Sequence, residues 1–257
     1  MQPQTVLITG ASWGIGLELA RQFAQHGHAL ILLARSAPAL EQLAQELRSA
    51  HQVQAEVLVA DLREAGAPAQ IAAALQQRGL QVDILVNNAG FGLLGPFAAL
   101  DAQQQGDMVQ VNIAALTALT RQFLPGMLER GRGGVLNVAS TAAFQSGPSM
   151  AVYYASKAYV LSFSEALHEE VDGTGLKVSC LCPGPTHTGF VAVAKMETSN
   201  LFKFGAHSAA QVAQYGYAAF QRNDAIAIPG LKNTLLALGS KLSPRFLSRR
   251  IAKAMNG

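Results

Sequence analysis

The chain has 257 residues, of which half are hydrophobic and 14% are charged, so its composition is not that of a disordered protein. The net charge of +3 is unevenly spread, because residues 231–257 carry six basic and no acidic side chains while the rest carries 13 basic and 16 acidic ones. This spread excludes a general nucleic-acid coat, which would need a basic face on the main domain.

The length fits one large α/β domain, and we expect a single domain over residues 1–257. The chain enters a strand-like run by residue 5 without the charged and apolar regions of a signal peptide, and no apolar run approaches the length of a membrane span. The two cysteines, Cys180 and Cys182, are expected to pack in the core, since they are too few for a disulfide framework or a tetrahedral metal site. We therefore expect a cytoplasmic protein.

Short apolar runs alternate along the chain with longer segments of helical periodicity. The runs are nearly continuous, as in strands that are covered on both faces. Segments between them, such as residues 17–27 and 39–50, are apolar at i, i+3 and i+4. Repeated β-α-β units of this kind predict an α/β fold with a doubly wound, seven-stranded parallel sheet between two layers of helices. The predicted strands are 5–9, 29–34, 55–60, 82–87, 133–139, 177–182 and 225–229.

The segment 183–207 breaks this rhythm, because it contains no clear strand. A long insertion near the carboxyl end of a strand is often a substrate lid, and we predict one here, with a pair of short packed helices as the alternative.

The tail, residues 231–257, predicts a C-terminal helical extension. Leucines recur at helical spacing through Leu242, and Ser243 and Pro244 then suit the N-cap and first position of a second helix. We expect two short amphipathic helices with basic outer faces that pack on their own domain. Contact with a membrane surface or with another subunit is the less favoured alternative.

The first predicted strand runs directly into "TGASWGIG", residues 9–16, and then into a helix. Gly10, Gly14 and Gly16 would let the backbone approach a ligand where a Cβ would obstruct it. The N-terminus of the following helix would point its free N–H groups at a phosphate. In this strand–turn–helix context the glycines predict a dinucleotide site.

The glycine spacing resembles that of the short-chain dehydrogenase/reductase family, whose pattern is T-G-x-x-x-G-x-G. Further family motifs follow in order: "NNAG" at 87–90, Asn112, Ser140, "YYASK" at 153–157 and "PGPTHT" at 183–188. The resemblance extends to about residue 190. It implies a single Rossmann-type domain with a seven-stranded parallel sheet, and usually a homodimer or homotetramer.

The resemblance also implies where a nicotinamide dinucleotide would bind. The glycine turn would hold the pyrophosphate, the "NNAG" residues would flank the ribose and nicotinamide, and the end of the third strand would lie by the adenine. The threonines of "PGPTHT" would reach the carboxamide and phosphate side. The implied cofactor residues are Gly10, Ser12, Trp13, Gly14, Ile15, Gly16, Asp61, Leu62, Asn88, Ala89, Gly90, Tyr153, Lys157, Pro183, Gly184, Thr186 and Thr188.

The end of the second strand predicts which cofactor is used. An acidic residue there would bind the adenosine ribose hydroxyls and favour NAD. Ala34 occupies that place and Arg35 follows it. Because a guanidinium suits a 2′-phosphate, we predict NADP(H).

Two adjacent tyrosines, Tyr153 and Tyr154, are candidates for a proton-transfer role with Lys157. At 100° per residue, Tyr153 lies about 40° and Tyr154 about 60° from Lys157 around a helix, so geometry only leans towards Tyr153. The family pattern Y-x-x-x-K selects Tyr153 as general acid/base, with Tyr154 as a packing residue. Lys157 would lower the pKa of Tyr153. By resemblance, Lys157 also binds the nicotinamide ribose, Ser140 stabilises the substrate oxygen and Asn112 anchors a relay water.

These residues predict an NADP(H)-dependent oxidoreductase that interconverts a carbonyl and a secondary alcohol. The apolar composition of the predicted lid favours an apolar small-molecule substrate. The six histidines form no metal motif, and His187 is expected to be a solvated loop residue although it lies near the predicted pocket. The alternative is a nucleotide-bound interaction protein that docks through its basic tail.

Overall fold

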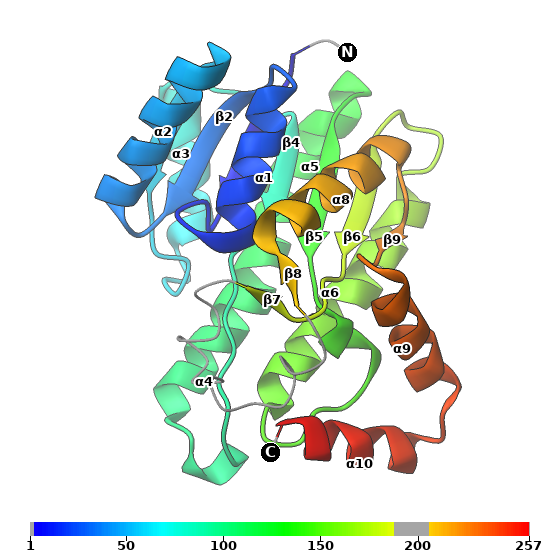
Figure 1. Ribbon diagram of the computed structural model, residues 1–257. Helices are drawn as coiled ribbons and strands as arrows, with labels where there is room; N and C mark the ends of the chain where they lie inside the picture. Colours follow the sequence, from blue (N-terminus) through cyan, green and yellow to red (C-terminus); the bar gives the residue numbers. More distant parts are fainter. Residues whose placement is uncertain (1–2, 188–205, 257) are drawn as a thin grey trace.

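The computed structural model describes residues 3–187 and 206–256. Seven parallel strands form one sheet in the order β3-β2-β1-β4-β5-β6-β9 (Figure 1). The chain proceeds from β1 outwards to β3, returns to β4 beside β1, and then continues in the other direction. The strands are β1 Thr5–Thr9, β2 Ala29–Ala34, β3 Ala55–Val59, β4 Ile84–Asn87, β5 Gly134–Val138, β6 Lys177–Leu181 and β9 Ile226–Ala227.

Helices cover both faces of this sheet, which gives the predicted three layers. Helices α1, α2 and α8 pack on one face, and α3, α5 and α6 pack on the other. Alternate strand residues serve the two layers: Val6 and Ile8 contact the first, whereas Leu7 contacts the second. The helices are α1 Gly14–Gln25, α2 Ala37–His51, α3 Ala67–Gln77, α4 Ala102–Val109, α5 Leu116–Arg130, α6 Ala151–Glu170 and α8 Ala209–Arg222.

All seven predicted strands are confirmed, and so is the doubly wound parallel fold. The last strand is shorter than predicted, with Ile226–Ala227 in place of residues 225–229. It forms the edge of the sheet and pairs only with Cys180 and Leu181 of β6. Cys180 and Cys182 are buried and free, as expected of core residues, and their Sγ atoms lie 3.7 Å apart.

The segment 183–207 differs from its prediction in one respect. A small parallel pair joins β7, Thr186–His187, to β8, His207–Ser208, where no strand was expected. Residues 188–205, which include Thr188 and most of the predicted lid, lie outside the described residues. The lid therefore stays a prediction.

The tail forms the two predicted helices, α9 Leu231–Leu242 and α10 Arg245–Asn256. The Pro244 carbonyl accepts hydrogen bonds from the backbone N–H groups of Leu247 and Ser248, so the second helix begins within one residue of the predicted start. The Ser240 hydroxyl donates to the carbonyl of Phe144, 3.2 Å away, and this bond ties α9 to the short helix η3, Thr141–Phe144. The tail thus packs on its own chain, and in the described ranges no helix is long and apolar enough to cross a membrane.

Phe23 on α1 is fully buried and packs edge to face against Tyr217 and Phe220 of α8. We expect Phe23→Ala to lower the free energy of unfolding by about 3–5 kcal/mol, since it leaves a cavity between two helices. Phe97→Ala is the matched control, because Phe97 is 64% exposed and its truncation should cost less than about 0.5 kcal/mol. Denaturant unfolding measures both values, and equal losses would contradict the assigned core.

Candidate active site

A cleft of about 1410 Å³ opens at the carboxyl edge of the sheet. Its walls come from the segments that follow β1 to β6, together with residues of α4, α6, α9 and α10. The strand order reverses between β1 and β4, so their following loops diverge and leave a crevice between them. The topology therefore provides the cavity, and the loop residues determine what it can bind.

The glycine turn forms part of the wall of this cleft. Gly10 and Gly14 have positive φ angles of 66° and 61°, which glycine adopts without steric cost. A Cβ on Gly16 would lie 2.3 Å from both the carbonyl oxygen of Gly10 and the side chain of Asn88. Helix α1 begins at Gly14 without a side-chain cap, and Trp13 is 41% exposed at the cleft wall.

A hydrogen-bonded latch joins the ends of β1 and β4. The Asn88 amide donates to the carbonyl oxygens of Thr9 (2.9 Å) and Gly10 (3.1 Å). The Thr9 hydroxyl accepts from the backbone N–H groups of Asn88 and Ala89, both at 3.0 Å, and donates to Val86. The side chain of Asn88 is therefore occupied in holding the glycine turn, and the cleft is bordered here by the backbone of residues 88–90.

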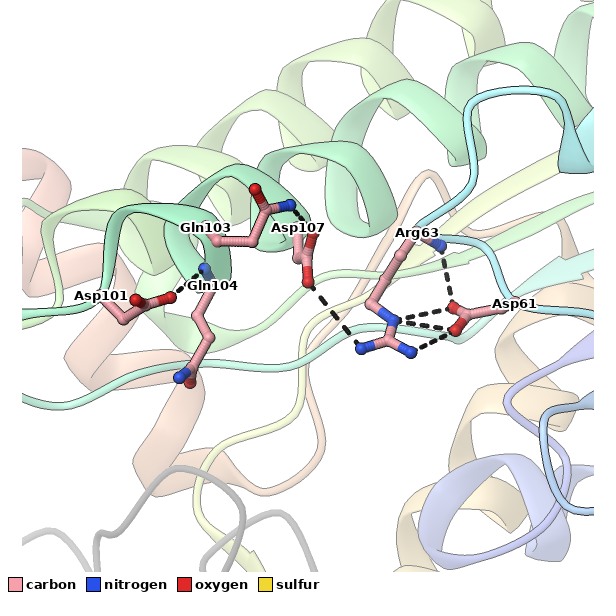
Figure 2. A network of polar contacts seen from close by, with 6 residues as sticks. All are labelled: Asp61, Arg63, Asp101, Gln103, Gln104 and Asp107. Carbon is pink, nitrogen blue, oxygen red and sulfur yellow. Dashed lines mark hydrogen bonds and ion pairs between the residues drawn. The ribbon is translucent and has the colours of Figure 1, made fainter.

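A charged network lies at the end of the cleft where the adenine is expected (Figure 2). The Arg63 guanidinium holds both carboxylate oxygens of Asp61, and its Nη1 lies 3.9 Å from the Asp107 carboxylate on α4. These hydrogen bonds from Arg63, together with nearby Arg35, keep the pKa of Asp61 below its ordinary value. Arg35 lines the same part of the cleft at the end of β2 and is exposed.

Asn112 lies behind the opposite end of the cleft, within the π-helical turn η2, Gln110–Ala115. Its amide donates to the Phe91 carbonyl and to the Ser156 hydroxyl, both at 3.0 Å, and its oxygen accepts from the Phe91 N–H at 3.1 Å. A Cβ on Gly90 would approach the Asn112 oxygen to 3.0 Å and the Lys157 ammonium to 3.3 Å. Such π-turns are frequent at functional sites, and this one aims a side chain at the loop after β4.

Ser140 and Tyr153 meet at the centre of the cleft, although 13 residues separate them. Ser140 follows β5 and caps η3, where its hydroxyl accepts from the Ala142 N–H at 3.1 Å. Burial raises the pKa of Tyr153 to about 12, and a hydrogen bond with the Ser140 side chain acts in the opposite direction. The two hydroxyl groups are therefore close enough to act on one substrate oxygen.

Lys157 lies one turn along α6 from Tyr153 and is 5% exposed. Its Nζ donates to the Val138 carbonyl at 2.8 Å and lies 5.9 Å from the centre of the Tyr153 ring. Burial lowers the pKa of Lys157 to about 8.

The expectation that Lys157 lowers the pKa of Tyr153 does not hold in this structure. The pKa of Tyr153 is raised, because burial outweighs every other influence on it. The Lys157 amine is directed to a backbone carbonyl, and its own burial disfavours the positive charge that would stabilise a phenolate.

Tyr154 behaves as the sequence predicted for a packing residue. It is 5% exposed and belongs to an apolar cluster with Met108, Ala142 and Met150, a cluster that also contains Tyr153, so burial alone does not separate the two tyrosines. Its ring covers Gly147 so closely that a Cβ there would lie 2.3 Å from the ring atoms. The ring also borders the cleft, so Tyr154 shapes the cavity that Tyr153 lines.

The loop after β6 closes the cleft on its third side. The Thr186 hydroxyl donates to the Gly184 carbonyl at 2.9 Å, and both residues line the cleft with Pro183. Gly184 lies against α9, where a Cβ would come within 2.6 Å of the Asn233 side chain. His187 is exposed on β7 and does not line the cleft.

The structure brings most of the predicted site together. Gly14, Gly16 and Asn112 do not line the cleft themselves, and Thr188 lies outside the described residues. All the others line one continuous cavity: Gly10, Ser12, Trp13, Ile15, Arg35, Asp61, Leu62, Asn88, Ala89, Gly90, Ser140, Tyr153, Lys157, Pro183, Gly184 and Thr186.

Sequence reasoning missed two parts of the cleft. One is Arg63 with Asp107, which no motif singles out because their contact joins separate segments. The other is the apolar side of α9, where Leu235 and Leu236 line the cleft. The leucine spacing of the tail indicated a helix but not where that helix would pack.

Comparison with known proteins identifies the family. A family model of short chain dehydrogenases matches residues 4–198. The chain is 37% identical over 182 residues to the NADP-dependent 3-hydroxy acid dehydrogenase YdfG of Salmonella typhi, which covers 70% of this chain and 71% of that protein. It is 35% identical over 194 residues to the very-long-chain 3-oxoacyl-CoA reductase of Anas platyrhynchos, which covers 74% of this chain and 62%, less than two thirds, of that relative.

A solved structure agrees with this assignment. The short-chain dehydrogenase from Sphingobium yanoikuyae in complex with NADPH superposes with a TM-score of 0.83 at 32% identity, and the match covers 91% of this chain and 90% of that one. With its seven-stranded sheet, glycine turn and matched sequence, the chain belongs to the short-chain dehydrogenase family.

Proposed function

We propose that this protein is an NADP(H)-dependent oxidoreductase that interconverts a carbonyl and a secondary alcohol on an apolar substrate. The observation that carries the proposal is the convergence of Ser140, Tyr153 and Lys157 in the same cleft as the glycine turn. The sequence relation to a 3-hydroxy acid dehydrogenase and a 3-oxoacyl-CoA reductase supports the carbonyl and alcohol chemistry.

The cleft has the features that a nicotinamide dinucleotide needs. Gly10 and Gly90 present backbone without side chains at its floor, where added Cβ atoms would meet Asn88, Ala89, Asn112 or Lys157. The start of α1 and the backbone of residues 88–90 would hold the phosphates and the nicotinamide ribose. When bound, the cofactor supplies or accepts the hydride.

Tyr153 and Ser140 handle the oxygen of the substrate. During reduction, negative charge develops on the carbonyl oxygen, and the Ser140 hydroxyl stabilises it by donating a hydrogen bond. Tyr153 transfers its phenolic proton to that oxygen, which completes the alcohol. A pKa of about 12 keeps the phenol protonated at neutral pH, so Tyr153 is ready to act as the acid in the reducing direction.

Lys157 and Asn112 connect Tyr153 to a source of protons. With a pKa near 8, the Lys157 amine exchanges protons close to physiological pH. Asn112 holds the Phe91 loop beside that amine through two hydrogen bonds, and the missing side chain of Gly90 leaves room between them. This space suits a water molecule that passes protons between solvent and Lys157.

Arg35 carries the proposed preference for NADP(H). It lines the adenosine end of the cleft, where Ala34 stands in place of an acidic residue. Its charge-assisted hydrogen bonds would hold a 2′-phosphate, and no carboxylate at the end of β2 competes for them.

The proposed substrate is apolar because of the wall that faces the catalytic groups. Leu93, Met150 and Tyr154 line one side of the cleft, and Leu235 and Leu236 of α9 line another. Burial of a hydrocarbon chain against such side chains is favoured by about 25 cal/mol for each Å² removed from water. A 3-oxoacyl compound, which joins a ketone to such a chain, is the substrate class in the name of the oxoacyl-CoA reductase, and the name of the 3-hydroxy acid dehydrogenase has its oxygen at the same carbon.

We expect Tyr153→Phe to lower turnover by at least about 100-fold, since it removes the proton donor but little volume. Tyr154→Phe is the matched control on the next residue and should keep turnover within a few-fold of the unmodified protein. NADPH oxidation with a panel of aliphatic ketones and 3-oxoacyl thioesters measures both, and NADPH fluorescence checks that the cofactor still binds. A Tyr153→Phe protein with full turnover would reject the proposed mechanism.

We expect Arg35→Asp to lower the ratio of kcat/KM for NADPH over that for NADH by on the order of tenfold to a hundredfold, because a charged hydrogen bond is lost and a repulsive carboxylate is added. Arg121→Asp makes the same change on the exposed side of α5 and should leave the ratio unchanged. Titration of each coenzyme gives a second readout, as only the Kd for NADPH should rise. Unchanged discrimination in the Arg35 variant would remove the basis for NADP(H).

The lowered pKa of Lys157 predicts how the free energy of unfolding changes with pH. Between about pH 8 and pH 10 the unfolded chain binds a proton on Lys157 that the folded protein releases, so the free energy of unfolding rises with pH. Relative to Lys157→Met, which does not titrate, the gain should be about 2 kcal/mol across these two pH units. The range ends at pH 10 because the raised pKa of Tyr153 acts in the opposite sense above it. Denaturant unfolding at several pH values measures the difference, and parallel pH curves for the two proteins would show that Lys157 has an ordinary pKa.

A further inference from the structure

Within the part of the chain that the structure describes, the two tail helices present an exposed apolar and basic surface. On α9, Leu231 is 77% and Leu238 is 52% exposed, and on α10, Phe246 is 54% exposed with Leu247 beside it. Exposed cations accompany them on α10. We name this set the tail surface, and its members are Leu231, Leu238, Phe246, Leu247, Arg249, Arg250 and Lys253.

The exposed leucines of α9 form a stripe rather than scattered positions. At 100° per residue, Leu231, Leu235 and Leu238 fall within about 60° of one another, on the side of the helix away from buried Ala237. A helix on an ordinary protein surface carries polar residues at such positions. Leu235 also reaches the rim of the cleft, so the stripe continues from the outer surface to the substrate side.

The outer face of α10 combines charge with an aromatic ring. Phe246, Arg249, Arg250 and Lys253 fall within about 100° around the helix, and the buried Ser248 lies on the opposite side. No aspartate or glutamate follows Asp224 in the sequence. The tail therefore offers no anion of its own to neutralise these cations.

We propose that the tail surface docks on a bilayer that contains anionic lipids. Helices that lie in the interface of a membrane combine an apolar stripe with exposed Lys and Arg, and aromatic residues among them. The apolar side chains would enter the boundary between headgroups and acyl chains, and the cations would pair with anionic headgroups. Complementary charge favours this occupant, because anionic lipid supplies the negative groups that the tail lacks.

A second copy of the same chain fits the surface less well. In a two-fold contact the same patch meets itself, so both copies would bring their cations into one interface. Like charges brought together in this way oppose association. A contact of another symmetry is an outcome that the test below distinguishes.

Docking would also orient the cleft. Figure 1 shows α10 lying across the end of the molecule to which the strands β5 and β6 point, and Leu235, Leu236 and Ser243 of the tail line the cleft. The mouth beside the tail would then lie close to the bilayer. This orientation, which rests on the proposed function, would give an apolar carbonyl compound a path from lipid to Tyr153; the docking itself does not depend on that function.

The test is sedimentation of the full chain with vesicles of phosphatidylcholine alone and of phosphatidylcholine with phosphatidylglycerol. We expect binding to the anionic vesicles only, weakened by added salt. Neutralising three cations with Arg249→Gln, Arg250→Gln and Lys253→Gln should lower the partition coefficient about fivefold for each, or on the order of a hundredfold together.

Two further variants separate charge from the apolar stripe. Leu231→Ser, Leu238→Ser and Phe246→Ser together should also abolish binding while leaving all cations in place. The control neutralises three exposed cations elsewhere, with Arg121→Gln, Arg132→Gln and Arg222→Gln, and should bind vesicles as the unmodified protein does. Circular dichroism and NADPH binding establish that every variant is folded.

Three results would overturn the proposal. The first is failure of the full chain to sediment with anionic vesicles at low ionic strength, and the second is equal loss in the tail and control variants. The third is a combination of two results: the unmodified protein does not bind vesicles, and the serine variant has a lower oligomeric mass by light scattering. The tail surface would then be covered by another copy of the chain. Because none of these readouts uses turnover, failure here is distinguishable from failure of the proposed oxidoreductase function.

Discussion

The latch between Thr9 and Asn88 is the constraint on which the rest of the site depends. It joins the two strands at which the order of the sheet reverses, and it holds the glycine turn against the loop after β4. Gly16 lacks a side chain because the Asn88 amide and the Gly10 carbonyl already occupy that space. The glycines thus serve the packing of the protein as well as the proposed approach of a phosphate, and one substitution there would disturb the packing directly.

From this latch the site continues by contacts along the same edge of the sheet. The loop that begins at Asn88 runs to Phe91, whose backbone is held by Asn112 in a π-turn. The Asn112 amide also donates to Ser156 on α6, the helix that carries Tyr153 and Lys157. Helix α6 and the loop after β4 are therefore joined by one buried side chain, and a change at Asn112 would move both. Buried polar groups linked in this way specify one arrangement when all are satisfied.

Most of the fold could be predicted from the sequence because its signals are local and strong. Continuous apolar runs, such as the one ending at Thr9, predict strands of a sheet that is covered by helices on both faces. Ser140 and Tyr153 could be assigned only with the help of the family pattern, since helical spacing alone left Tyr154 as a rival. The contact of Arg63 with Asp107 could not be predicted, because it depends on how the loop after β3 faces α4 across the cleft. The sign of the pKa shift at Tyr153 was also missed, because burial is a property of the folded protein and outweighed the influence expected of Lys157.

The tail shows why a sequence pattern can be right about structure and still leave function open. Leucines at helical spacing predicted a helix. In the structure Ala237 lies on the buried face of that helix, and Leu231 and Leu238 lie on its exposed face. The buried face borders the cleft, whereas the exposed face carries apolar side chains that make little contact with the domain. Folding alone therefore does not account for the outer leucines, because substituting them by polar residues would cost the fold little. An exposed apolar stripe beside cations, in a tail whose own sequence carries no acidic residue, is best accounted for by a partner that is both apolar and anionic, and a bilayer surface has both properties at the depth where a helix lies.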